Sequence, residues 1–137
     1  MTFRLSLATD DDLDVIIGLV EEAATWLRRK GTDQWARPWP SREARDRRIW
    51  SDLLTRKTWI ARDRGGDPAA TITTEVAPDR ILEVDWDADP ATYVHRLVVS
   101  RNHSGRGLGA ALLNWAGRRA ARYYRAQWIR KIGRAHV

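Results

Sequence analysis

The chain has 137 residues, which predicts a single domain, and its 43% hydrophobic and 31% charged residues are typical of a globular protein. It contains no cysteine, which excludes a disulfide scaffold, a thiolate metal site and a cysteine nucleophile. Its 3 histidines are scattered, so we expect no metal site. No apolar run reaches the roughly 20 residues of a membrane span and the first residues lack a signal-peptide pattern, so we expect a cytoplasmic protein without membrane contact.

The charge balance favours an anionic partner. Lysine and arginine number 24 against 18 acidic residues, a net charge of +6. Nearly all of the basic residues are arginines, and they are dispersed along the chain rather than gathered on one element. This pattern favours solvated faces, and we expect no nucleic-acid partner. A basic nucleic-acid-binding module remains the alternative from another functional class.

Hydrophobic periodicity divides the chain into strands and helices. Alternating apolar residues predict strands, and apolar residues three and four apart predict helices. The predicted elements, in chain order, are a strand at Phe3–Leu7, helices at Leu13–Lys30 and Arg42–Leu54, strands at Thr58–Arg62, Ala69–Val76 and Thr92–Val99, a helix from Ala110 to about Tyr124, and a strand at Gln127–Arg130. The order β-α-α-β-β-β-α-β predicts an α/β domain over residues 1–131.

Capping and turn residues set the expected ends of these elements. Thr9–Asp12 supplies N-cap candidates for the first helix, and Gly31 stops that helix. Ser41 is the N-cap candidate of the second helix. The turn at Arg64–Pro68 predicts an antiparallel hairpin between the strands on either side. The acidic connection that follows the hairpin contains a further candidate strand, Ile81–Val84. Four tryptophans on predicted elements are expected in the core: Trp26, Trp50, Trp59 and Trp115.

The last six residues, Ile132–Val137, do not continue the pattern. They cut a strand short and supply no cap, turn or core position. They also match the in-frame translation of a common short-read sequencing adapter, ATC GGA AGA GCA CAC GTC. We therefore expect residues 132–137 to be an adapter-derived artefact of a truncated reading frame, and we give His136 no function. A genuine frayed terminus is the alternative.

A glycine-rich segment, Ser104–Ala110, joins the strongest predicted strand to a helix. Glycines there allow positive φ and a close approach of the backbone to a ligand. Their amides, with the first free amides of the helix, then favour an anion such as phosphate. A tight strand-to-helix connection is the alternative. The spacing Gly-x-Gly-x-Gly fits neither a Walker A loop nor the dinucleotide fingerprint well.

The segment Val98–Leu113 resembles motif A of the GNAT (GCN5-related) N-acetyltransferases, Gln/Arg-x-x-Gly-x-Gly/Ala after a strand. The order of predicted elements also matches the first five strands and three helices of that fold. One departure is Ser104, which stands where the motif usually has Gln or Arg. The resemblance implies a GNAT fold with a mixed central sheet that lacks its final helix and strands. It also implies transfer of an acetyl group from acetyl-CoA to a primary amine by direct attack in a ternary complex.

The resemblance also implies where acetyl-CoA binds. Backbone amides would hold its diphosphate, and the preceding strand, splayed from the next one, would pair with the pantetheine arm. A strand amide near Val98 would polarise the thioester carbonyl. The implied diphosphate residues are Gly105, Arg106, Gly107, Leu108, Gly109 and Ala110, and the implied strand residues are Leu97, Val98 and Val99.

An attacking amine must lose a proton, and His95 on the central strand is the candidate base. Strand alternation predicts that His95 shares one face with Tyr93, Leu97 and Val99. A histidine satisfied inside the core is an equal alternative. The second choices for the base are Glu83 and Asp85. In many members of this family a tyrosine after the fifth strand protonates the leaving thiolate, and this chain stops before that position.

The loop between the first two helices borders the acceptor site in this family. Gln34, Trp35 and Trp39 are therefore candidates for an aromatic wall that contacts a small-molecule or peptide amine, with loop packing as the alternative. An inactive, truncated fragment of the GNAT fold is a further alternative to an active enzyme. The oligomeric state also stays open, and a homodimer is one possibility.

Overall fold

The computed structural model describes residues 2–31, 41–76, 91–124 and 128–131. One five-stranded sheet runs through them in the order β1-β2-β3-β4-β5, and only β4 and β5 are parallel. The strands are β1 (Arg4–Leu7), β2 (Thr58–Arg62), β3 (Pro68–Val76), β4 (Ala91–Val99) and β5 (Trp128–Lys131). The helices are α1 (Leu13–Arg29), α2 (Arg42–Leu54) and α3 (Leu108–Tyr124). The predicted order of elements and the mixed sheet are confirmed.

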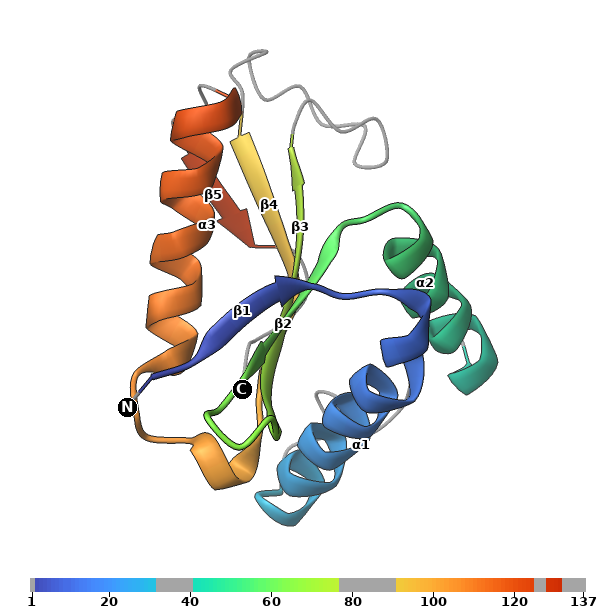
Figure 1. Ribbon diagram of the computed structural model, residues 1–137. Helices are drawn as coiled ribbons and strands as arrows, with labels where there is room; N and C mark the ends of the chain where they lie inside the picture. Colours follow the sequence, from blue (N-terminus) through green and yellow to red (C-terminus); the bar gives the residue numbers. More distant parts are fainter. Residues whose placement is uncertain (1, 32–40, 77–90, 125–127, 132–137) are drawn as a thin grey trace.

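The sheet lies between two helical layers: α3 covers one face, and α1 with α2 covers the other (Figure 1). Each layer buries its own apolar cluster against the strands. The α3 cluster contains Ala61, Ala69, Ala70, Ile72, Val94, Leu97, Val99, Leu108, Leu112 and Ala116. The α1 and α2 cluster contains Ala8, Ile16, Leu19, Val20, Ala23, Ile49, Leu53, Ile60 and Val98. Strands β2 and β4 each contribute side chains to both clusters, so both strands are covered on their two faces.

Local capping explains where the first two helices begin and end. The Thr9 amide donates to Asp12 Oδ2 over 2.9 Å in the short 3-10 turn that precedes α1. Gly31, with a φ of 81°, follows the end of α1, as expected for a glycine that stops a helix. Ser41 Oγ accepts a hydrogen bond from the Ala44 amide over 3.1 Å at the start of α2. No helix in the described ranges is both long and apolar enough to cross a membrane.

The buried face of α2 differs from the predicted one. Trp50 was expected in the core, but 39% of it is exposed. The inward stripe instead consists of Arg45, Ile49 and Leu53, which are four residues apart. Arg45 reaches Glu21 Oε1 on α1 over 2.7 Å, so this buried position carries an ion pair rather than an apolar contact. A polar residue in the buried stripe weakens the amphipathic pattern and explains the error.

Candidate functional site

The glycine-rich segment connects β4 to α3 and has the predicted backbone conformation. Gly105 and Gly107 have φ values of 78° and 74°, in the left-handed region that favours glycine. A Cβ atom at either position would meet nothing within 4 Å. The glycines are therefore required by backbone conformation rather than by crowding, and the space beside them is open.

Most backbone amides of this segment donate no hydrogen bond within the described residues. The first helical bond of α3 runs from the Ala111 amide to the Gly107 carbonyl over 3.0 Å. No acceptor in the described part of the chain takes a hydrogen bond from the amides of Gly105, Gly107, Leu108, Gly109 or Ala110. The first turn of α3 also carries no acidic side chain. Open amides at the positive end of a helix dipole are suited to an anion.

Contacts from α1 and β3 hold the start of this loop. The Arg101 amide donates to Glu22 Oε1 over 2.7 Å, and the Arg101 guanidinium lies 3.9 Å from the centre of the Trp26 ring. The Ser100 amide donates to the Ala69 carbonyl over 2.8 Å. Ser104, the departure from the family motif, donates from Oγ to the Arg101 carbonyl over 2.9 Å. Its side chain therefore stabilises the loop internally.

A further contact ties the loop to the turn between β2 and β3. His103 is buried, and its Nε2 lies 2.9 Å from Asp63 Oδ2. The Phe3 ring approaches His103 edge-on, with 6.0 Å between the ring centres. Sequence reasoning missed this contact because Asp63 and His103 lie 40 residues apart and belong to no shared motif.

A bulge in β4 corrects one prediction about His95. Ile72 of β3 stands opposite both Arg96 and Leu97, and Arg96 has a φ of 50°. The extra residue reverses the alternation, so Leu97 packs with Val94 in the α3 cluster. The prediction that His95 shares a face with Leu97 and Val99 is wrong: His95 faces the side of α1 and α2.

His95 lies beside a carboxylate that sequence reasoning also missed. Its Nε2 is 3.6 Å from Glu75 Oε2, and the other Glu75 oxygen pairs with Lys57 Nζ. Glu75 is only 16% exposed at the side chain. The approach follows from the register between β3 and β4, because alternation along β3 places Thr73 and Glu75 on the same face and Thr73 pairs with His95.

Next to this group, Arg96 forms a second ion pair. Its Nη1 lies 3.1 Å from Asp52 Oδ2 on α2 and 3.4 Å from Thr73 Oγ1. Burial lowers the pKa of the Arg96 guanidinium, while Asp52 opposes that shift. The bulge residue is thus anchored to α2, which fixes the backbone of β4 on either side of it.

The ladder between β4 and β5 involves only part of β4. In the described part of the chain, β5 pairs with Ala91–Val94 and not with Leu97–Val99, and β3 pairs with Val98 and Val99 on the other side of β4. The same ranges contain no group of three or more metal-ligating side chains. Several predicted sites lie outside the described residues: Gln34, Trp35, Trp39, Glu83, Asp85, the candidate strand Ile81–Val84 and the tail 132–137.

Comparison with known proteins assigns the family. The family profile described as "Acetyltransferase (GNAT) family" matches residues 20–132. An uncharacterized N-acetyltransferase, YesJ of Bacillus subtilis, is 33% identical over 112 residues, which are 80% of this chain and 61% of that protein. This chain thus spans less than two thirds of its relative.

Solved structures agree on the fold. A GNAT-family acetyltransferase from Listeria monocytogenes superposes with a TM-score of 0.74 at 23% identity, covering 88% of this chain and 70% of the other. An acetyltransferase from Clostridium acetobutylicum, solved with acetyl-CoA, gives 0.64 at 14% identity, covering 96% and 81%. On the profile match and the identity to its relative, the chain belongs to the acetyltransferase (GNAT) family.

Proposed function

We propose that the protein uses acetyl-CoA to acetylate a primary amine. The observation that carries the proposal is the positive φ of two glycines together with a set of open amides, those of Gly105, Gly107, Leu108, Gly109 and Ala110. Such amides suit a diphosphate, and acetyl-CoA is the donor expected of the family. Ser104 contributes no side chain to this cradle in the proposal, because its hydroxyl is engaged with Arg101.

The strand before the loop is proposed to hold the pantetheine arm. The backbone of Leu97, Val98 and Val99 would pair with its amide groups, and a strand amide near Val98 would donate to the thioester carbonyl. The bulge at Arg96 supports this role because it fixes the local backbone through the ion pair with Asp52. A donor held in place before the reaction stabilises the negative charge that develops on the carbonyl oxygen.

In the proposed reaction the amine nitrogen attacks the thioester carbon, the carbon–sulfur bond breaks, and coenzyme A leaves as the thiolate. His95 takes the proton that the amine loses, directly or through a water. Glu75, 3.6 Å from His95, would stabilise the imidazolium that forms, and Lys57 limits that effect by sharing the carboxylate. The acceptor class is a small-molecule or peptide amine, and Gln34, Trp35 and Trp39 are proposed to contact it.

Calorimetric titration with coenzyme A tests the proposal, combined with thiol release from acetyl-CoA across a panel of amines. Gly107→Val should abolish coenzyme A binding because it removes the left-handed backbone of the loop. Gly31→Val is the matched control: Gly31 has a similar φ of 81° and the same open surroundings, but it ends α1.

Both variants should lose about 1–2 kcal/mol of stability from backbone strain, and only the first should lose coenzyme A. Binding that survives Gly107→Val would mean that the loop is merely a turn. No binding by the unmodified protein would refute the proposal.

A further inference from the structure

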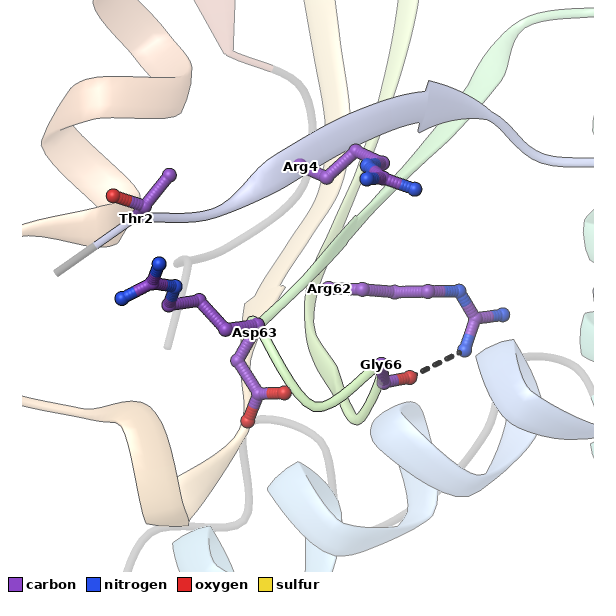
Figure 2. A pocket seen from close by; sticks show the side chains of 6 residues that line it. Thr2, Arg4, Arg62, Asp63 and Gly66 are labelled. Atoms are coloured by element: carbon purple, nitrogen blue, oxygen red, sulfur yellow. Dashed lines mark hydrogen bonds between the residues drawn. The ribbon is translucent and has the colours of Figure 1, made fainter.

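A hollow of about 290 Å³ lies between the start of β1 and the turn that joins β2 to β3. None of its lining residues belongs to the segment assigned to acetyl-CoA. The lining residues are Thr2, Arg4, Arg62, Asp63, Arg64 and Gly66. This volume is near the lower end of the roughly 300–1,000 Å³ of small-molecule pockets. We call it the arginine hollow (Figure 2).

Two of its arginines are direct cross-strand partners. Arg4 of β1 stands opposite Arg62 of β2 in the antiparallel register, so both side chains leave the same face of the sheet. Figure 2 shows them extending in the same direction from neighbouring strands. Directly opposite residues have Cβ atoms about 4.5–5.5 Å apart, and like charges in such a pair repel each other. The fold therefore holds two cations together at the edge of the sheet.

Only one arginine of this pair has its charge balanced by a carboxylate. Arg62 donates to Asp12 Oδ1 over 3.0 Å and to the Gly66 carbonyl over 3.1 Å. Arg4 and Arg64 form no ion pair or hydrogen bond with any residue in the described ranges. Both residues are exposed, and both line the hollow. Two guanidinium groups are thus available to a ligand.

The single carboxylate of the lining is already engaged. Asp63 accepts hydrogen bonds from the amides of Gly65 and Asp67 over 2.9 and 3.0 Å, and its other oxygen lies against His103. Figure 2 shows Asp63 pointing away from Arg4 and Arg62. Asp63 forms no ion pair with Arg4, Arg62 or Arg64, and the three arginines of the lining outnumber its one carboxylate.

We propose that the arginine hollow binds a phosphate group, through Arg4 and Arg64, with Arg62 adding charge and Thr2 a hydroxyl. The planar guanidinium fork matches the oxygen geometry of phosphate, and a dianion relieves the repulsion between the paired arginines. The hollow is larger than one phosphate, so it accommodates the adjoining part of a larger molecule. The phosphate has two sources, a free or metabolite-borne phosphate and the 3′-phosphate of coenzyme A. The second source rests on the proposed function.

Titration with inorganic phosphate at constant ionic strength tests the site. Arg4→Gln and Arg64→Gln should each weaken phosphate binding by about tenfold, as expected when one charge-assisted contact is lost. Arg47→Gln and Arg118→Gln are the matched controls, because they remove the same charge from exposed positions on α2 and α3. All four arginines are exposed, so we expect each variant to fold, and thermal unfolding checks this.

The glycine loop is a competing phosphate site, so the titration is repeated with Gly107→Val. Phosphate binding that survives this substitution and falls with the Arg4→Gln/Arg64→Gln pair supports the arginine hollow. Binding that follows Gly107 alone, equal loss in the Arg47→Gln and Arg118→Gln controls, or no binding at all would overturn it. Failure of the proposed acetyl transfer leaves this result unaffected, because inorganic phosphate is the probe.

Titration with coenzyme A and with 3′-dephospho-coenzyme A identifies the source of the phosphate. If the cofactor supplies the phosphate, the double arginine variant should lose affinity for coenzyme A by about tenfold or more and keep its affinity for the dephospho form. If the affinity for both forms is unchanged while phosphate binding is lost, the hollow serves a separate phosphorylated ligand. Both results support the site and differ only in its occupant.

Discussion

The Nε2 atom of His103 lies 2.9 Å from Oδ2 of Asp63, and this contact ties the loop before α3 to the turn between β2 and β3. The other ring nitrogen of His103, Nδ1, is buried and has no hydrogen-bond partner in the described part of the chain. The position of the ring therefore depends on Asp63 and on the edge of Phe3. Because Asp63 also lines the arginine hollow, one carboxylate connects both candidate anion sites.

Asp63→Asn should destabilise the protein in a pH-dependent way. The hydrogen bond from His103, followed by that from the Asp67 amide, lowers the pKa of Asp63 from its ordinary value of 3.8. A lowered folded-state pKa stabilises the protein above that ordinary value, and the contribution is lost as pH falls through the folded-state pKa. Urea denaturation should therefore show a difference between wild type and variant at pH 7 that shrinks near pH 3.

Asp67→Asn is the matched control in the same turn, because the Asp67 side chain is exposed and forms no hydrogen bond or ion pair within the described ranges. It should leave the urea midpoint almost unchanged at both pH values. A destabilisation by Asp63→Asn that is equal at neutral and acidic pH would show that the carboxylate charge plays no part.

Local sequence signals were sufficient for most of the elements. Arg42–Leu54 and Thr58–Arg62 have the predicted bounds because a serine cap and a short alternating run act within a few residues. The positive φ values of Gly105 and Gly107 were predictable for the same reason, since few other residues adopt that conformation.

Features that depend on strand register were not predictable in this way. The bulge at Arg96 is held by Asp52, a residue 44 positions away. The alternating pattern of β4 does not predict this bulge. Once alternation is broken, every later side chain changes face. Glu75 was missed for a related reason, because its approach to His95 follows from the pairing of β3 with β4.

His95→Ala should reduce turnover far more than the affinity for coenzyme A. Removal of a general base costs about 10²–10⁴-fold in rate, whereas the proposed cofactor contacts lie on the loop and on Leu97–Val99. Steady-state kinetics with an acetylated amine, together with calorimetric titration of coenzyme A, separates the two effects. A pH–rate profile that is the same in wild type and variant would exclude His95 as the base.

Glu75→Gln and Lys57→Met should shift the pH–rate profile in opposite directions. The Glu75 carboxylate favours the protonated imidazole of His95, so its removal should move the acidic limb of the profile to lower pH. Lys57 shares that carboxylate, so its removal should strengthen the effect on His95 and move the limb to higher pH. A common loss of rate with no movement of either limb would assign Glu75 a structural role only.

Glu21→Gln should weaken the contact between α1 and α2. The hydrogen bond from Arg45 lowers the pKa of Glu21 below its ordinary value of 4.5, so the pair stabilises the fold above that value and loses its effect as pH falls through the folded-state pKa. Because Glu21 is about one third exposed, we expect a loss of about 1 kcal/mol or less at pH 7. Chemical denaturation of Asp67→Asn, which replaces an exposed acid outside the helices, provides the comparison. An equal loss in the two variants at pH 7, or a loss in Glu21→Gln that persists at pH 3, would contradict the expected role of the Arg45 pair.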